Sequence, residues 1–349
     1  MNSATDALKA SVIEYCSIIG ADPLLVQGAG GNISWKDGDT LWVKASGTWL
    51  AEAAEKDIFV AVDLPIILAA IEKGDFSVAP KLRGESALRP SIETLLHALM
   101  PHRVVIHLHA IEVLAHLVRV SWQKDFQSLV NTHPNWVTAV YNKPGAELAE
   151  AVSLALQNTT NANVVFLQNH GIVIGGADLD EVDQILKIVI DALRTPSCQY
   201  CFKQPSVMSL NIDGQTTYHP VSDQAVHQLA TEADLFSRLE SNWALYPDHV
   251  VFLGDFAHTY ADEETLQREL RGSANLPELI FIQGLGVFTK SGFSTAKLVQ
   301  LRCYYDILVR QHEEHGINAL TAQQIGELLN WDAEKYRMGM SNKLSDADL

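Results

Sequence analysis

A stretch at residues 89–109 constrains the fold more than any other part of the chain. Apolar side chains recur at three- and four-residue steps over residues 91–100, behind a Pro-Ser start signal, which predicts a helix. Glu93 then lies in its first turn. The β-branched run that follows predicts a buried strand at residues 103–108. The sequence therefore brings a carboxylate, a helix and a buried strand close together.

Two histidines lie at the end of this predicted strand. Side chains two apart share one face of a strand, so His107 and His109 are expected on one face and Leu108 on the other. Two imidazoles on one face can bind one zinc ion, each at roughly 2.0–2.1 Å. The competing interpretation is that they are hydrogen-bonded core histidines.

His170 is the candidate for a third metal ligand. It lies in Asn169-His170-Gly171, which separates two apolar runs that predict buried strands. Functional groups are commonly displayed on loops held by rigid neighbours. A third histidine, together with Glu93, favours a metal site over a pair of core histidines.

The length of the chain indicates two domains. A chain of 349 residues exceeds the usual single-domain size, and 47% hydrophobic with 19% charged residues is typical of a globular protein. A helix is predicted at residues 178–201 and a linker at 205–220, which is rich in turn formers. We expect domains at residues 1–205 and 215–349. The second would be a small α/β unit with a helix at residues 221–239 and a strand at 249–254.

Charge and cysteine content exclude several classes of protein. A net charge of −17 repels nucleic acid and anionic membrane surfaces, so neither is expected as a partner. No apolar run is long enough to cross a bilayer, and the first 20 residues lack the pattern of a secretory signal, so cytoplasm is the expected location. Four cysteines cannot form a disulfide framework, and Cys198 and Cys201 are interpreted as packing or surface thiols.

Residues 28–34 form a glycine-rich turn. A dinucleotide fingerprint would need its third glycine at Ile33, and a hairpin rather than a helix is predicted next, so that interpretation fails. The alternative is an anion-binding concavity of bare N–H groups, helped by Asn32 and Ser34. A tight turn that needs positive φ is the competing interpretation for its glycines.

A second small-residue turn follows the strand predicted at residues 41–48. Ser46 and Gly47 could also cradle a phosphate or a carboxylate there. Positive charge gathers near the proposed site in the loop at residues 81–89. Arg89, beside the site helix, is the expected substrate contact, because a guanidinium suits oxyanions.

Five segments, in this order, resemble the class II aldolase/adducin family. They are Gly30-Gly-Asn-Ile-Ser34, Ala45-Ser-Gly47, Pro90-Ser-Ile-Glu93, His107-Leu-His109 and Asn169-His-Gly171. Within this family the chain is most similar to the aldolase half of bifunctional rhamnulose-phosphate aldolase/short-chain dehydrogenase proteins. Residues 215–349 echo the extra C-terminal region of that half. The chain stops before any dehydrogenase, so oxidoreductase activity is expected to be absent.

The resemblance implies a three-layer α/β/α class II aldolase-like domain with a smaller C-terminal α/β region. It implies a homo-oligomer, with a tetramer favoured and sites between neighbouring subunits. It also assigns roles to residues. Glu93 would be the acid/base and a possible extra metal ligand, three histidines would bind Zn2+ or another divalent cation, and several small residues would bind the substrate phosphate. These positions are His107, His109 and His170 for the metal, and Gly31, Asn32, Ser46, Gly47 and Ser91 for the substrate.

The implied activity is that of a class II, metal-dependent aldolase. Such an aldehyde-lyase would cleave a ketose, expected to be a phosphorylated sugar, by retro-aldol chemistry through a zinc-stabilised enediolate. Apolar Ile92, Leu95 and Leu96 would raise the pKa of Glu93 toward neutrality. Ile92 also stands where many phosphate-binding members have a second serine, which predicts a weaker phosphate site.

Two alternatives stay open at this point. A decarboxylase or an epimerase of a sugar (acid) phosphate would use the same metal site. A non-catalytic adducin-like interaction protein would lack the metal ligands, and the intact histidines and Glu93 count against it.

Overall fold

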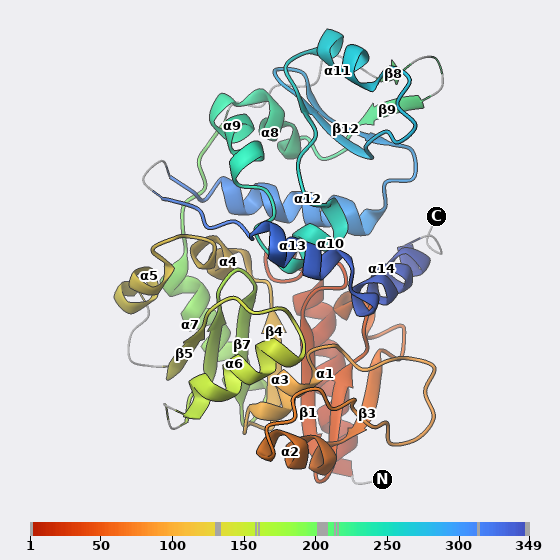
Figure 1. Cartoon of the computed structure of the whole chain (residues 1–349). Coiled ribbons are helices and arrows are strands. Elements are labelled where there is room, and N and C mark those ends of the chain that lie inside the picture. Colours follow the sequence, from red (N-terminus) through yellow and green to blue (C-terminus); the bar gives the residue numbers. More distant parts are fainter. Residues whose placement is uncertain are drawn as a thin grey trace.

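Two β-sheets lie at opposite ends of the molecule, with a layer of helices between them (Figure 1). The computed structural model describes residues 3–129, 134–157, 159, 161–200, 209–212, 214, 216–312 and 315–345. Cys201 and the start of the predicted linker, residues 205–208, lie outside these ranges. The expected α/β class is confirmed. Within the described ranges, no helix combines the length and the apolar character needed to cross a membrane.

The larger sheet has seven strands in the order β3-β2-β1-β4-β7-β6-β5, and all its neighbours are antiparallel except β5 and β6. The hairpin predicted after residue 34, the strand predicted at residues 103–108 and the two strands predicted on either side of His170 are all present. The strands are β1 Asn32–Asp37, β2 Thr40–Lys44, β3 Phe59–Asp63, β4 Val104–Leu108, β5 Trp136–Ala139, β6 Val164–Leu167 and β7 Gly171–Gly176.

Helices cover both faces of this sheet, which confirms the expected α/β/α layers. Helices α1 Ser3–Gly20, α4 Ile111–Leu117 and α7 Leu179–Leu193 share one core with alternate residues of β4, among them Ile106 and Leu108. Helices α2 Leu64–Glu72, α3 Thr94–Leu99 and α6 Ala146–Gln157 cover the opposite face, where Val105 packs. The strand period of two therefore turns His107 toward α3, away from Leu108.

The smaller sheet has five strands in the order β10-β11-β12-β9-β8. They are β8 Leu210–Ile212, β9 Thr216–Pro220, β10 Thr259–Tyr260, β11 Leu279–Ile282 and β12 Gly286–Lys290. The remaining helices are α5 Trp122–Leu129, α8 Gln228–Thr231, α9 Ala233–Ser241, α10 Pro247–Leu253, α11 Glu263–Leu270, α12 Thr295–Leu308, α13 Ala322–Leu329 and α14 Asp332–Ser345, with short 3-10 turns at Leu50–Glu52 and Ala225–His227. Helices α10, α12 and α13 lie between the sheets, and α14 returns to the larger one (Figure 1).

Four element predictions were wrong. Residues 249–253 lie in helix α10 instead of a strand. Pro247 starts this helix, and because the helix is buried on nearly all sides, its apolar sequence does not show the helical period. The helix expected at 178–201 ends at Leu193, just before a Thr-Pro step that disfavours helix. The described part of the predicted linker forms the β8–β9 hairpin. The helix expected at 221–239 is divided into the 3-10 turn, α8 and α9.

The C-terminal half is tied to the larger sheet's helices by a buried ion pair. Helix α12 packs against α4. Just after α12, Arg310 donates from Nε and Nη2 to Glu112 Oε1 of α4, at 3.1 and 3.0 Å. Both side chains are about nine-tenths buried. A charge left alone there would be costly, because neither water nor a counter-ion could solvate it.

We predict that Arg310→Gln lowers the stability of the protein by about 3–5 kcal/mol, because it leaves the Glu112 carboxylate buried without its cation. The Glu112→Gln/Arg310→Gln double variant should lose far less, since it buries no unpaired charge. Thermal unfolding followed by circular dichroism measures both. Equal losses in the single and double variants would contradict the prediction.

Candidate metal centre and substrate pocket

Three buried histidines gather beneath the start of helix α3. His107 and His109 come from the end of β4, and His170 from the turn between β6 and β7. One nitrogen of each lies within 4.8 Å of the other two. The Nε2 atoms of His107 and His109 are 3.2 Å apart. The structure thus brings together the three residues that the sequence singled out.

The surroundings of the rings aim their Nε2 atoms at a common centre. His107 Nδ1 lies 3.1 Å from the carbonyl oxygen of Ile172, to which it can donate, leaving Nε2 as an acceptor. His109 Nδ1 lies 3.4 Å from Asp248 Oδ2. A backbone carbonyl and a carboxylate are the usual second partners of metal-binding imidazoles.

The turn that carries His170 is held by the C-terminal half. Asn169 has a left-handed backbone (φ 52°), and its Nδ2 donates to the carbonyls of Leu245 and Asn318 at 2.8 and 2.7 Å. Gly171 is required because a Cβ there would lie 2.3 Å from the Leu108 carbonyl oxygen. These contacts set the His170 ring against β4.

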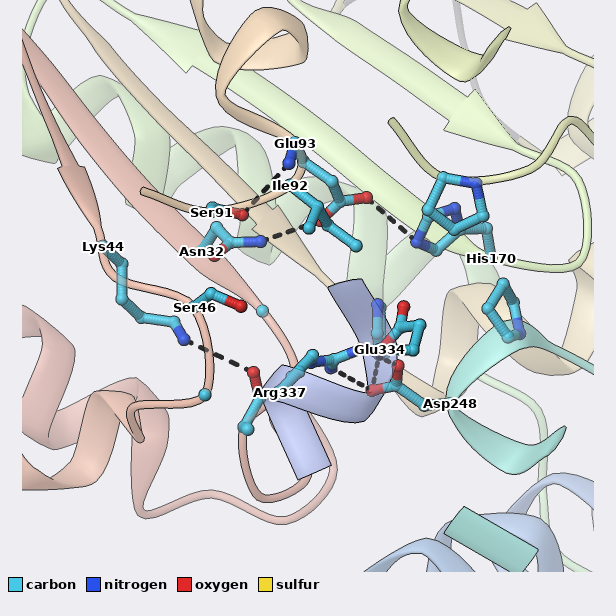
Figure 2. Close-up of a pocket in the computed structure, with 16 residues that line it drawn as sticks. Asn32, Lys44, Ser46, Ser91, Ile92, Glu93, His170, Asp248, Glu334 and Arg337 are labelled. Atoms are coloured by element: carbon cyan, nitrogen blue, oxygen red, sulfur yellow. Dashed lines mark hydrogen bonds and ion pairs between the residues drawn. The ribbon is translucent and has the colours of Figure 1, made fainter. Parts of the chain in front are cut away.

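Glu93 lies beside the histidines at the start of α3 (Figure 2). Its Oε1 is 3.2 Å from His170 Nε2 and its Oε2 is 3.5 Å from His107 Nε2. Asn32 Nδ2 donates to the same Oε2 at 2.8 Å. Asn32 is placed there because it pairs with His107 across β1 and β4. A buried carboxylate and three imidazoles therefore share one small volume.

The expectation that apolar neighbours raise the pKa of Glu93 was wrong. Burial alone would raise this pKa, but His107 and His170 outweigh burial and hold the pKa of Glu93 well below its usual range. The ring nitrogens of His170 and His107 lie 3.2 and 3.5 Å from the carboxylate oxygens, and positive charge at that position favours the ionised form of Glu93. At neutral pH Glu93 is a carboxylate.

The residues fit a divalent metal ion. Two nitrogens on a tetrahedral zinc ion lie about 3.3 Å apart when each bond is roughly 2.0–2.1 Å, close to the spacing of His107 and His109 Nε2. Glu93 Oε1 is buried and makes no hydrogen bond to the described residues. A cation between the rings would satisfy the imidazole lone pairs and this oxygen together.

A second group of lining residues forms a small polar cradle next to the histidines. A bridge between Ala45 and Pro90 holds two loops together, and Ser46 N donates to the Arg89 carbonyl at 2.9 Å. This places Ser46 beside Ser91 (Figure 2). The predicted substrate residues Gly31, Asn32, Ser46, Gly47 and Ser91 all line the same pocket.

Two residues that the sequence placed near the substrate, Ser34 and Arg89, are not among the residues that line this pocket. Ser34 lies beneath α3, where its hydroxyl is 2.8 Å from His97 Nδ1, because β1 continues under the helix. Arg89 is exposed and is not among the pocket-lining residues. Its guanidinium stacks on Tyr336, 4.3 Å from the ring centroid. Arg89 thus anchors helix α14 to the rim in this structure.

Lys44 is a fully buried cation in the pocket wall. Its Nζ donates to the backbone carbonyls of Thr48, Ala29 and Ala45, at 2.6, 3.3 and 3.4 Å. Burial, with help from the nearby charge of Arg337, lowers the pKa of Lys44 to about 7. Its three protons point to the backbone, so Lys44 mainly fixes the loops that form the cradle.

The C-terminal half supplies one wall that sequence reasoning missed. Asp248 of α10 and Glu334 and Arg337 of α14 line the pocket, together with Pro247. Arg337 pairs with both oxygens of Asp248 (Figure 2). Burial alone would raise the pKa of Asp248, but Arg337 and His109 outweigh it and hold that pKa well below its usual range. Two sequence signals could have indicated helices in this region. They are Pro247 as a helix start and a Thr321–Gln324 capping box before α13.

Comparisons with known proteins match the first half of the chain. The model of the class II aldolase and adducin N-terminal domain matches residues 10–195. A Bacillus subtilis (strain 168) protein named "Uncharacterized oxidoreductase YuxG" is 26% identical over 176 residues, which cover 46% of this chain and 25% of that protein. The chain thus spans about a quarter of the length of that relative.

Several solved structures are similar over the same half. The N-terminal class II aldolase domain of a Thermoplasma acidophilum protein is 26% identical, with a TM-score of 0.45, and covers 52% of this chain and 90% of that one. A sugar-phosphate aldolase from Thermotoga maritima is 16% identical, with a TM-score of 0.43 and coverage of 55% and 94%. An L-fuculose-1-phosphate aldolase from Thermus thermophilus is 17% identical, with a TM-score of 0.36 and coverage of 53% and 91%.

The lowered pKa of Lys44 leads us to predict that the stability of the protein depends on pH. Its pKa is about 7 in the folded protein against 10.5 as an ordinary lysine. Between these values the unfolded chain binds more protons, so the free energy of unfolding rises with pH for this group. We expect the melting temperature of wild type, minus that of Lys44→Met, to increase from pH 7 to pH 10. A difference that stays flat or falls would show that Lys44 keeps an ordinary pKa.

Proposed function

The chain belongs to the class II aldolase and adducin family, and from this premise we propose that it is a metal-dependent aldolase that cleaves a phosphorylated ketose by a retro-aldol reaction. The observation that carries the proposal is the convergence of His107, His109 and His170 on Glu93 in one buried pocket. An interaction protein without catalysis would have no need to bury these groups together.

His107, His109 and His170 would hold Zn2+ or another divalent cation. Neutral imidazoles leave the charge of the ion intact, so a bound ion would polarise the carbonyl of the substrate as a Lewis acid. Ile172 and Asp248 keep the rings of His107 and His109 in the orientation that this requires.

Glu93 is proposed to move the proton. It is ionised at neutral pH, so it can accept a proton from the substrate hydroxyl when the carbon–carbon bond breaks, or return one to carbon. Asn32 holds one carboxylate oxygen by its 2.8 Å hydrogen bond, which fixes the direction of transfer. Burial of Glu93, with 6% exposure, keeps competing water away from the reacting atoms.

The cradle of small residues is proposed to bind the phosphate of the substrate. Ser46 and Ser91 offer hydroxyl groups and Gly31 and Gly47 offer bare backbone, which suits an oxyanion. Ile92 lines the same pocket without a polar group. A phosphate there would need a further donor, because the net charge of −17 disfavours it.

We also propose separate roles for the two parts of the chain. Residues 1–205 would form the metal-binding catalytic unit, and residues 215–349 a smaller unit that adds a wall to the pocket. The proposed assembly is a homotetramer, as the sequence resemblance implies, and light scattering after gel filtration would measure it.

We predict that purified wild type contains a divalent ion and that His107→Ala loses most of it, because two imidazoles hold zinc weakly. Glu93→Gln should keep the ion but lower kcat about 10²- to 10⁴-fold, because it cannot move a proton. The exposed His219 provides the control, and His219→Ala should keep both ion and activity. Elemental analysis and product assays measure these outcomes.

The assay decides between related reactions. Rhamnulose 1-phosphate and fuculose 1-phosphate should release dihydroxyacetone phosphate if the protein is the proposed aldolase. Carbon dioxide from 3-oxo-tetronate phosphates would indicate a decarboxylase, and a rearranged sugar phosphate an epimerase. If the wild-type protein contains no divalent ion and shows no activity when one is added, the proposal that it is an enzyme is refuted.

A further inference from the structure

Arg337 is a positively charged side chain of helix α14 that lines the pocket (Figure 2). Its Nη1 donates to Asp248 Oδ1 at 2.5 Å and its Nη2 to Asp248 Oδ2 at 2.7 Å. Nη1 also lies 3.3 Å from Glu334 Oε2. The side chain is 10% exposed, so this paired end of the guanidinium is held in a fixed orientation.

The other edge of the guanidinium has two N–H groups that donate to none of the described residues. A guanidinium has five N–H groups, and Nη1 and Nη2 supply the three recorded bonds to Asp248 and Glu334. Among the described residues no hydrogen bond is made by Nε, and Nη2 makes one. Nε–H and the second Nη2–H are parallel, the geometry that a phosphate or carboxylate accepts through two oxygens.

The backbone of helix α14 lies next to the cradle, and Arg337 lines the same pocket as Ser46 and Ser91. A Cβ atom on Gly47 would lie 2.6 Å from Met340 Cβ and 3.1 Å from the Arg337 carbonyl oxygen, so the helix packs directly on the Ser46–Gly47 turn. At its other end the Arg337 side chain reaches Asp248, which contacts His109. Arg337 therefore spans the distance between the cradle and the histidines.

Lys44 cannot take the same role without giving up its existing bonds. It also lines the pocket, but its Nζ donates to the carbonyls of Ala29, Ala45 and Thr48. Of these two cations in the pocket wall, Arg337 is the one with unused donors. It can therefore bind an anion while keeping its ion pair with Asp248.

We propose that Arg337 is the specificity-determining residue for the anionic end of the substrate. Its Nε–H and Nη2–H donate to the phosphate that Ser46 and Ser91 also contact. This rests on the proposed function, since it names the part of the ketose phosphate that the C-terminal half recognises. It also supplies the further N–H donors that a phosphate needs there beside the two serines, since Ile92 offers none.

A purely structural Arg337 would only neutralise Asp248 and hold α14 in place. That role would affect stability but would leave the preference for phosphorylated over unphosphorylated ligands unchanged. The two roles therefore differ in a binding measurement that does not depend on catalysis.

The first experiment measures binding of inorganic phosphate to the full chain by calorimetry, at constant ionic strength in chloride. Wild type should bind phosphate saturably. Arg337→Gln, combined with Asp248→Asn so that no charge is left unpaired, should raise the Kd at least tenfold. Arg337→Lys keeps a charge for Asp248 but loses the parallel donors, so it should give a similar loss and serves if the double variant does not fold.

A matched control removes a buried arginine pair elsewhere. The Glu112→Gln/Arg310→Gln variant loses the same kind of ion pair outside the pocket and should keep wild-type phosphate affinity. Metal content is measured on every variant, because Asp248 also contacts His109. An unchanged metal content separates loss of the anion contact from loss of the metal centre.

The second experiment compares KM and kcat for a ketose phosphate and the matching unphosphorylated ketose. Arg337→Lys should raise KM for the phosphorylated substrate at least tenfold and should lower kcat/KM much more for the phosphorylated substrate than for the unphosphorylated one. An equal loss on both substrates, absence of saturable phosphate binding by wild type, or a variant Kd within twofold of wild type would overturn the proposal. If no ketose is cleaved, the proposed function fails, yet phosphate binding still decides the role of Arg337.

Discussion

The burial of Glu93 among three imidazoles is the constraint on which the rest of the site depends. A carboxylate removed from water is unstable unless donors or cations surround it. Here Asn32 supplies one hydrogen bond, and His107 and His170 supply the nearest ring nitrogens. Each of these comes from a different part of the larger sheet, so the sheet must form in the observed register before the carboxylate can be buried.

That register also explains why the site lies on one face of the sheet. Pairing of β1 with β4 sets Asn32 opposite His107, and the period of two turns Leu108 into the core on the other face. The bare backbone of Gly171 lets β7 approach β4 closely enough for His170 to join them. Strand geometry, more than the loops, positions the three histidines.

The C-terminal half completes this arrangement from outside the family domain. Asp248 faces the outer nitrogen of His109, and the carbonyls of Leu245 and Asn318 hold Asn169 next to His170. Arg337 balances the charge of Asp248. Asp248 thus links Arg337 to a histidine of the first half, which makes the wall formed by α10 and α14 part of the pocket.

The sequence by itself determined the layered first half, the hairpin, and the three histidines with Glu93. These features depend on local periodicity and on motifs that carry their own turn chemistry. The tertiary structure alone decided that Arg89 lies outside the pocket, that the pKa of Glu93 is lowered, and that Asp248 and Arg337 line the site. The physical reason is that charge pairing and burial depend on distances between segments far apart in the chain, such as Asp248 and Arg337, which are 89 positions apart. Local patterns carry no information about these distances.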